Sequence, residues 1–304
     1  TVYPGCTEEV CVPLLEKGSG LKLGADFKVG YSPERINPND SEHTFSNTAK
    51  IVSANDGQAL DEVARVYAEV VAADLCRASG IRVAEAAKMT ENVQRSVNIA
   101  LMNELQRLFS RMGIDMGEVI DMASSKWNFV KYRPGLGGGH CIPVDPLYLV
   151  SAASKLGVEM PVTSSGCAVN DGMAAYVVRS LLGAMGSDGR GARALLMGVT
   201  YKENIDDIRN SRIAEMVGLL EREGMSVDVT DPHADPDKVY AMYGIRPVPA
   251  LRPPYDLIVV AVAHDEYRGL DDAYFRSISR GAALLGDIRG LYKGRIKSLG
   301  YWSL

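Results

Sequence analysis

Residues 81–112 carry the most regular pattern of hydrophobic and polar positions in the chain. This stretch contains no glycine or proline, and its apolar side chains recur at helical spacing, at positions 93, 97, 100, 101, 105, 108 and 112. At 1.5 Å per residue, such a helix is roughly 45 Å long. Because one small domain does not need a helix of that length, we expect it to connect two domains or to pair with its copy in a second molecule.

The residues before this helix mix two kinds of short pattern. Strand-like runs occupy 27–31 and 50–53, and helical spacing occupies 7–17 and 57–73. Strands that alternate with helices are typical of an α/β domain.

The last third of the chain alternates continuous apolar runs with helical patterns. The apolar runs lie at 194–199, 226–230, 256–262 and 282–287. Continuous hydrophobicity indicates strands buried on both faces, as in a doubly wound parallel sheet. Such sheets bind ligands at the carboxyl ends of their strands. Polar residues follow each run, at 201–204, 231–233, 264–265 and 287–290.

Together these patterns predict an α/β protein in three parts. Residues 1–75 form part of an N-terminal Rossmann-like domain, and residues 76–188 form a central region built on the long helix. Residues 189–304 form a C-terminal domain with a doubly wound parallel sheet.

Composition narrows the class of protein. With 46% hydrophobic residues, a chain of 304 residues can fill a core in each of two domains. The formal net charge of −5 gives no broad basic surface, so we expect no nucleic acid partner. No apolar run approaches the length of a membrane span, so we expect no membrane insertion.

The cysteines and histidines narrow the class further. The five cysteines, at 6, 11, 76, 141 and 167, form an odd set without a CxxC pair, which argues against a disulfide framework and favours the reducing cytoplasm. The four histidines, at 43, 140, 233 and 264, show no metal-ligand spacing, so we expect no metal site.

The strongest candidate for chemistry is the segment Arg133-Pro-Gly-Leu-Gly-Gly-Gly-His-Cys-Ile-Pro-Val-Asp-Pro146. Its glycines leave backbone amides unshielded and let the chain pass close to an anionic ligand. Cys141 follows directly and Asp145 comes at an expected helix start, so a nucleophile and an orienting group can converge. The competing interpretation makes Cys141 a small buried hydrophobic residue. The segment does not match GxGxxG, because His140 stands where a glycine belongs.

Lys88 and Asn92 form a second candidate on the long helix. They are four residues apart and share a helix face next to the apolar stripe. An ammonium and an amide placed together can hold a developing oxyanion or a water molecule. The alternative is a lysine whose ammonium reaches the solvent, next to a solvated amide.

Two loops add charged residues. In Tyr31-Ser-Pro-Glu-Arg-Ile-Asn-Pro38 the prolines make the loop rigid and can hold Glu34 in a cleft, with an ordinary surface ion pair as the alternative. In Tyr201-Lys-Glu-Asn204, followed by Arg209 and Ser211, a strand end and a helix start suit a phosphate or pyrophosphate group. A solvated charged loop is the alternative there.

These four motifs, in this order, resemble those of the UDP-glucose and GDP-mannose dehydrogenase family, and the resemblance covers essentially the whole chain. The residues at 31–38, Lys126-Trp-Asn-Phe129 and Arg133-Pro-Gly135 are most similar to the branch that oxidises UDP-N-acetylhexosamines for surface polysaccharides. The resemblance implies NAD as the cofactor and a UDP-sugar as the substrate.

The resemblance also implies catalytic roles. Cys141 is the nucleophile, Lys88 and Asn92 hold the oxyanion and a water molecule, Asp145 assists general base catalysis, and Glu34 lines the hydrolysis site. The C6 alcohol of the sugar is oxidised to an aldehyde, which the thiol traps as a thiohemiacetal. A second oxidation gives a thioester, and water then releases the carboxylate.

Substrate contacts follow from the same resemblance. It implies that Arg133, Gly138 and Gly139 contact the phosphates and the sugar, while Lys202 and Arg209 belong to the UDP-binding domain. Arg209 also lies near the nicotinamide of the cofactor in the family pattern.

The resemblance assigns two further residues and an assembly. Thr1 corresponds to a threonine whose hydroxyl joins the water network, and Glu34 also lies beside the cofactor. The long helix forms the core of a homodimer or a higher oligomer. Either Lys126 or Lys131 is the basic residue that reaches the partner's site.

The sequence departs from the family at its start. The family begins with a strand, a GxGxxG turn and an acidic residue for the adenosine ribose, and none of these lies at or after Thr1. We therefore expect the NAD-binding portion to be absent, NAD affinity to be largely lost and the first sheet to have an open apolar edge. The alternative to an enzyme is a non-catalytic module that binds a UDP-sugar and dimerises.

Overall fold

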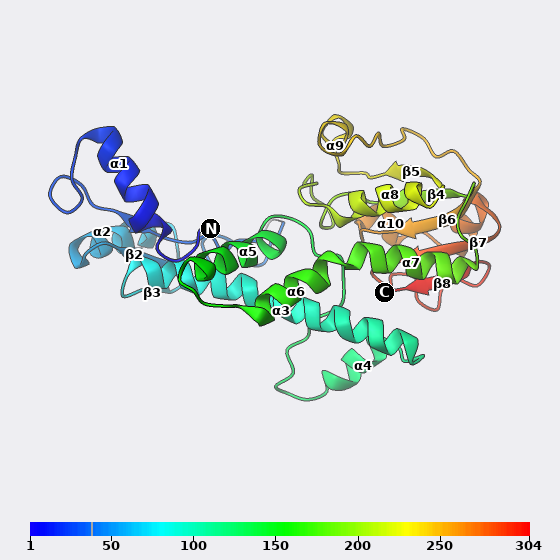
Figure 1. The fold of residues 1–304 in the computed structure, drawn as a ribbon, viewed down its shortest axis with the longest axis horizontal. Helices are drawn as coiled ribbons and strands as arrows, with labels where there is room; N and C mark the ends of the chain where they lie inside the picture. The colour runs from blue at the N-terminus through cyan, green and yellow to red at the C-terminus, as the bar shows by residue number, and fades with distance from the viewer. Residues whose placement is uncertain (38) are drawn as a thin grey trace. The chain divides into compact units, whose positions relative to one another are not determined.

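The computed structural model describes residues 1–37 and 39–304, so Pro38, which ends the motif at 31–38, lies outside the described residues. The chain forms two compact units, whose helices and strands are labelled in Figure 1. Among the described residues, no helix has both the length and the hydrophobicity that a membrane span requires. The first unit comprises Thr1–Arg95 and Val144–Ser164, and the second comprises Ser96–Pro143 and Ser165–Leu304.

A three-stranded sheet forms the centre of the first unit. Its strands are β1 (Gly30–Tyr31), β2 (Lys50–Ala54) and β3 (Leu75–Arg77), in the order β1-β2-β3. β2 is antiparallel to β1 and parallel to β3, and α2 (Gly57–Ala68) connects the parallel pair. The α/β pattern expected for these residues is confirmed.

A buried glutamate anchors the first helical segment of this unit. η1 (Thr7–Cys11) is a π-helix that continues into α1 (Val12–Ser19). The carboxylate of Glu85, which is fully buried, accepts hydrogen bonds from Gly5 N at 2.6 Å, Thr7 N at 2.9 Å and Thr7 Oγ1 at 2.6 Å. Because a buried carboxylate needs donors around it, these three bonds fix the start of η1.

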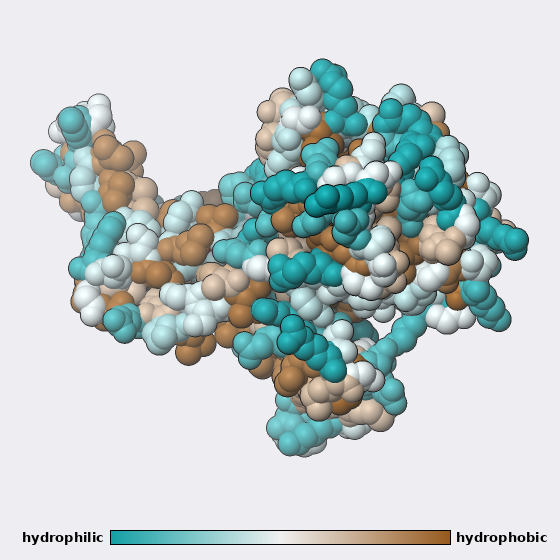
Figure 2. Space-filling model, turned by 45° about the vertical axis from the view of Figure 1, so that its right-hand side comes forward, coloured by the Kyte–Doolittle hydropathy of each residue, from teal (hydrophilic) through white to brown (hydrophobic). Residues whose placement is uncertain are grey.

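The exposed hydrophobic residues of the first unit are spread over several segments. Leu14 and Leu15 of α1 are 63% and 51% exposed, and Figure 2 shows hydrophobic atoms along one side of the helix. Val66 of α2 is 64% exposed. The edge strand β3 exposes Cys76 and Arg77. The open apolar edge that the sequence suggested for the first sheet is therefore not found at β3.

The long helix predicted at 81–112 is confirmed as α3 (Ile81–Arg111). Its residues up to Arg95 belong to the first unit and the later ones to the second. The unit boundary also falls within α5 (Cys141–Lys155). The remaining helices of the central region are α4 (Met116–Ala123), α6 (Pro161–Asp171) and α7 (Met173–Met185).

A five-stranded sheet dominates the second unit. Its order is β5-β4-β6-β7-β8, and all neighbouring strands are parallel. The strands are β4 (Arg193–Met197), β5 (Ser226–Thr230), β6 (Tyr255–Val260), β7 (Ser279–Asp287) and β8 (Gly300–Ser303). The helices beside them are α8 (Arg212–Arg222), α9 (Pro236–Tyr243), α10 (Asp265–Arg268) and α11 (Asp272–Ile278).

Hydrophobic cores cover both faces of this sheet. On one face, Leu181 of α7 and Met216 of α8 pack in the same cluster as Leu196 of β4. On the other face, Phe275 of α11 packs in a cluster with Leu195, the preceding residue of the strand. Successive strand residues point to opposite faces, so β4 serves both cores. Helices on both faces of a parallel sheet, seen in Figure 1, confirm the doubly wound fold.

Candidate active site

Three of the predicted catalytic residues lie together in the first unit. Asn92 of α3 is 2% exposed, and its Nδ2 donates a 2.6 Å hydrogen bond to Oδ2 of Asp145, which is 5% exposed on α5. Lys88, one helical turn before Asn92, is 9% exposed. The amide of Asn92 is therefore not solvated, in contrast to the alternative interpretation.

Lys88 makes no hydrogen bond or ion pair with any residue that the structure describes. The side chain of Lys88 is largely buried, and a negatively charged partner would compensate the charge of its ammonium. A negatively charged oxygen of a ligand would provide that compensation. The burial of Lys88 next to a polar amide therefore suits a binding function better than a packing function.

Tyr31 adds a phenol to this part of the first unit. Its hydroxyl oxygen is buried and has no hydrogen-bond partner among the described residues. Burial, together with the carboxylates of Glu85 and Asp145, raises the pKa of Tyr31 to about 12. The phenol is therefore a neutral donor that lacks an acceptor, a state that buried polar groups rarely keep without water or a ligand. Tyr31 is the first residue of the motif at 31–38, but the sequence predicted no role for it.

The Glu34 loop is tied to α3 by its neighbour. Arg35 pairs with Glu91, with 2.9 Å between the guanidinium and the carboxylate. Glu34 itself has a side chain that is 58% exposed, and it lies 3.5 Å from the ammonium of Lys50. Burial opposes its ionisation, but the amides of Ile36 and Arg35 and this ammonium hold its pKa below the ordinary value. Glu34 is therefore an anion beside a buried lysine, and its catalytic role stays a prediction.

Cys141 and Thr1 are both exposed. Cys141 is the first residue of α5, so the helix begins four residues before the start expected at Asp145, which lies one helical turn after Cys141. The alternative of a buried, inert cysteine is wrong. The N-terminal end of a helix favours negative charge, which suits a thiolate nucleophile. The catalytic roles of both residues stay predictions.

The glycine loop packs against the C-terminal sheet within the second unit. Gly139 has a φ of +80°, and a Cβ there would lie 2.8 Å from the ring of Tyr201. A Cβ on Gly138 would lie 2.9 Å from Cβ of the same tyrosine. The amide of Gly139 donates to the carbonyl of Arg209 at 3.0 Å, and Asn210 Nδ2 donates to the carbonyl of Gly139 at 3.0 Å. Only glycine allows this close approach of the two loops.

Buried amides hold the other end of the loop. Asn103 of α3 accepts from Gly135 N at 2.8 Å and donates to Gly135 O at 3.2 Å. Its amide nitrogen also donates to Asn170 Oδ1 at 2.9 Å, and Asn170 donates to Ser96 O at 3.0 Å. Because these side chains are almost completely buried, the network fixes the loop to α3 and α6.

A cationic cavity of about 260 Å³ lies at the carboxyl ends of β6 and β7. Arg133, Arg268 and Arg289 line it, together with Glu203 and hydrophobic residues. Three guanidinium groups around one cavity suit a diphosphate, since each can bind phosphate oxygens through paired N–H groups. Ligand binding was expected at the carboxyl ends of these parallel strands, where the cavity lies. No role was predicted for Arg268 or Arg289 themselves.

The other two predicted substrate residues lie elsewhere in the second unit. The guanidinium of Arg209 forms a bidentate pair with Asp207, at 2.9 and 2.5 Å, and this hydrogen bond is the main reason that the pKa of Arg209 is raised. Arg209 lines a separate cavity with Asp206 and Lys238. Lys202 is partly buried, and its carbonyl accepts from Thr200 Oγ1 at 2.9 Å. The substrate roles of Lys202 and Arg209 stay predictions.

A polar network joins the ends of β4, β5 and β6. Asp231 Oδ2 accepts from Val199 N at 2.6 Å and contacts His264 Nε2 at 3.2 Å. His264 Nδ1 accepts from Asn204 N at 3.0 Å, and Nε2 also contacts Thr200 Oγ1 at 3.2 Å. Burial opposes ionisation of Asp231, but its hydrogen bonds from His264 and from backbone amides hold its pKa well below the ordinary value. The network fixes the loop at 199–204, which carries Tyr201 and Glu203.

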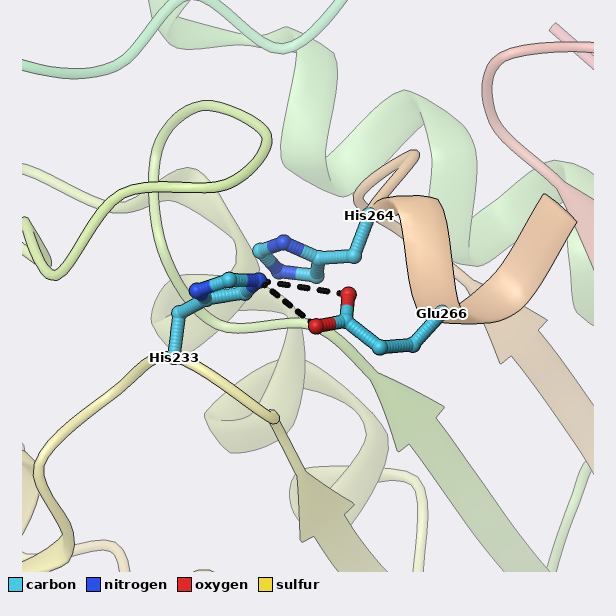
Figure 3. Close-up of side chains that lie close together, drawn as sticks. All are labelled: His233, His264 and Glu266. Carbon is cyan, nitrogen blue, oxygen red and sulfur yellow. Dashed lines mark hydrogen bonds and ion pairs between the residues drawn. The ribbon is translucent and has the colours of Figure 1, made fainter. Parts of the chain in front are cut away.

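The same sheet end brings together two histidines and a glutamate, shown in Figure 3. The rings of His233 and His264 stack with 4.8 Å between centroids, and His233 Nε2 lies 3.2 Å from the carboxylate of Glu266. Histidine spacing in the sequence gave no sign of this group. Both ring nitrogens of His264 already take part in hydrogen bonds, so it has no nitrogen left for a metal ion.

Three family models match consecutive parts of the chain. Residues 1–71 match the NAD binding domain, residues 82–172 the central domain and residues 195–294 the UDP binding domain of the UDP-glucose/GDP-mannose dehydrogenase family. The chain belongs to this family and is a dehydrogenase that uses NAD.

Relatives and solved structures agree with this assignment. The UDP-N-acetyl-D-glucosamine 6-dehydrogenase of Pseudomonas aeruginosa is 46% identical over 96% of this chain and 70% of that protein. The enzyme of the same name from Salmonella typhi is 44% identical over 95% of this chain and 69% of that protein. The structure of a UDP-D-ManNAc dehydrogenase from Pyrococcus horikoshii has a TM-score of 0.87 at 26% identity and covers all of this chain and 70% of its own.

The match at residues 1–71 corrects one expectation. The NAD-binding portion was expected to be absent from the chain, and that expectation is wrong. It rested on the lack of a GxGxxG turn, which is only one part of such a domain. The strands β1 to β3 with α2 supply another part, whose short runs carry no fingerprint in the sequence.

Some structural features of the first unit suit the binding of NAD, and others do not. Its parallel pair of strands suits a nucleotide-binding α/β domain. The starts of η1 and α2 do not suit a pyrophosphate, because Glu85 occupies amides at the start of η1 and Asp56 accepts from Ala59 N at the start of α2. We therefore assign no described residue to the pyrophosphate of NAD.

Replacement of Gly139 by alanine tests the packing of the glycine loop. Positive φ and contact with Tyr201 both oppose a Cβ, so Gly139→Ala lowers the free energy of unfolding by about 2 kcal/mol. Urea denaturation measures this change. Gly137→Ala is the control, because the nearest atom to its Cβ lies 3.8 Å away. Equal free energies of unfolding for the two variants would contradict the proposed packing.

Proposed function

We propose that the chain catalyses the NAD-dependent, four-electron oxidation of the C6 alcohol of a UDP-N-acetylhexosamine to the uronic acid. UDP-N-acetyl-D-glucosamine is the preferred substrate in this proposal. The names of the relatives at 46% and 44% identity support this substrate, and so do the motifs at 31–38 and 133–135.

The observation that carries the proposal is the buried hydrogen bond between Asn92 and Asp145. It holds two polar side chains at 2.6 Å in a part of the first unit where Lys88 is buried without a partner among the described residues. The helix that carries Asp145 begins at Cys141. Such a group of an ammonium, an amide and a carboxylate suits chemistry that develops charge on oxygen.

Each residue has a distinct role in the proposed reaction. The chemistry that bound NAD supplies is acceptance of a hydride, once from the alcohol and once from the thiohemiacetal. Cys141 forms the thiohemiacetal with the C6 aldehyde and later holds the acyl group as a thioester. Lys88 and the second N–H of the Asn92 amide stabilise the oxyanion. Asp145 accepts a proton from the water that releases the carboxylate, with Glu34 and Thr1 beside this water.

The second unit binds the nucleotide part of the substrate in this proposal. The cavity lined by Arg133 and Arg289 takes the diphosphate, and the backbone of Gly138 and Gly139 lies beside the sugar. Lys202 contributes a further positive charge. Arg209 reaches both the substrate and the cofactor once it leaves Asp207.

A dimer built on α3 completes the proposal, with Lys126 or Lys131 reaching the partner's site. A reducing compartment such as the cytoplasm belongs to this proposal, because the five cysteines form an odd set without a CxxC pair. We propose the three domain boundaries 1–75, 76–188 and 189–304 for this assembly.

An assay of full-length protein that carries this sequence, with NAD and a panel of UDP-sugars, tests this proposal. A UDP-N-acetylhexosamine should give two molecules of NADH per sugar, because both oxidations occur before release. Absorbance of NADH and quantification of the uronic acid measure this ratio. Turnover of other UDP-sugars but of no UDP-N-acetylhexosamine would contradict the proposed substrate, and one NADH per sugar would contradict the four-electron oxidation.

Substitution of the proposed nucleophile tests its role. Cys141→Ser should lower acid formation at least about 1,000-fold, because the thioester can no longer form, and should leave the Kd of the UDP-sugar nearly unchanged. Cys76→Ser, which alters another exposed cysteine, is the control. Full acid formation by Cys141→Ser would remove this thiol from the mechanism.

A further inference from the structure

A second cationic cavity lies in the second unit, apart from the one that we assign to the substrate. It has a volume of about 640 Å³ and is formed by the C-terminal part of α3 and by α7. Three of its lining residues are arginines, namely Arg107, Arg111 and Arg179, and one is an acid, Glu104. The proposed mechanism uses none of these residues, although Glu104, Arg107 and Arg111 lie on α3, the helix on which the proposed dimer is built.

The charges of these arginines are uncompensated within the described part of the chain. None of the three forms an ion pair or a hydrogen bond with a described residue, whereas Arg193, Arg212 and other arginines pair with aspartates. The chain as a whole carries a formal net charge of −5. Three unpaired cations that meet at one cavity of an acidic protein create a local positive potential, which attracts anions.

Helix geometry directs the side chains into this cavity. Arg107 and Arg111 are four residues apart on α3, and Tyr176 and Ser180 are four residues apart on α7, so each pair shares a helix face. The guanidinium of Arg107 lies over the ring of Tyr176, 5.8 Å from its centroid, which restricts its motion. The cavity therefore has partly ordered donors on two walls.

The size and the donors select a class of ligand. The volume of about 640 Å³ lies within the range of sites for small organic molecules, which is roughly 300–1,000 Å³, and exceeds what a single inorganic phosphate fills. Guanidinium groups bind phosphate oxygens through paired N–H groups, and the hydroxyls of Ser110 and Ser180 supply further donors. A ligand with two linked phosphates matches three cations better than a singly charged anion does.

We propose that this cavity is a separate binding site for a diphosphate, either free pyrophosphate or the diphosphate of a nucleotide. Its occupation does not require the proposed catalytic function. A negatively charged segment of a second copy of the chain is the competing occupant, and the experiment below distinguishes it.

Calorimetric titration of the full protein with pyrophosphate tests the proposal. Arg179→Gln should weaken pyrophosphate binding at least about tenfold, because a charge-assisted contact is lost. Arg222→Gln on α8 is the matched control, since it removes another exposed arginine that does not line the cavity, and it should bind as the unaltered protein does. Arg179→Lys, which keeps the charge, should recover part of the affinity.

Titration with UDP separates the two sources of the diphosphate and the two cavities. We expect two binding events, of which Arg179→Gln removes one and Arg289→Gln removes the other. If UDP shows only the event that Arg179→Gln removes, and Arg289→Gln changes nothing, the result counts against the proposed substrate site but leaves the present proposal standing. UDP that binds the Arg179 site more tightly than pyrophosphate identifies a nucleotide as the ligand, and equal affinity identifies free diphosphate.

Two results would overturn the proposal. One is pyrophosphate affinity that is the same in Arg179→Gln, in Arg222→Gln and in the unaltered protein. The other is a lack of pyrophosphate binding combined with a change of oligomeric state in Arg179→Gln, seen by analytical ultracentrifugation. That second result would assign the cavity to contact with another copy of the chain.

Discussion

The hydrogen bond between Asn92 and Asp145 is the interaction on which the proposed chemistry depends. It is buried and 2.6 Å long, and it joins α3 to α5 inside the first unit. The same unit contains the largely buried side chain of Lys88 and the buried hydroxyl of Tyr31, which has no hydrogen-bond partner among the described residues. A buried hydroxyl without an acceptor is costly and suits a site that binds a ligand or water.

In the second unit, contacts at both ends hold the glycine loop in one conformation. The Asn103 amide fixes one end of the loop and the ring of Tyr201 supports the other. Tyr201 in turn lies on a strand end that Asp231 and His264 hold in place. The arginines that line the adjacent cavity therefore stand on a rigid frame, which lowers the entropic cost of binding a diphosphate.

The sequence predicted the parts of the fold that have long or strongly periodic patterns. α3, the buried strands of the parallel sheet and the α/β character of residues 1–75 were all expected. β3, β8 and α9 to α11 were missed, because elements of three to eight residues give too little periodicity to identify. In the candidate site, spacing along one helix brought out Lys88 and Asn92. Tyr31, Arg268 and Arg289 were not assigned roles, because their significance comes from contacts between distant segments. The expectation that the NAD-binding domain is absent was wrong, because it rested on the lack of a glycine-rich turn. The short strands of that domain give only a weak pattern in the sequence.

A double-mutant cycle on Asn92 and Asp145 tests the central claim most directly. The turnover number kcat for UDP-N-acetyl-D-glucosamine would be measured for Asn92→Ala, Asp145→Ala and the double variant, with circular dichroism to confirm folding. If the hydrogen bond organises the site, the two substitutions are coupled by at least about 1 kcal/mol, because the second removes an interaction that the first has already broken. Effects on kcat that add to within about 0.5 kcal/mol would mean that the residues act independently, and would contradict the account.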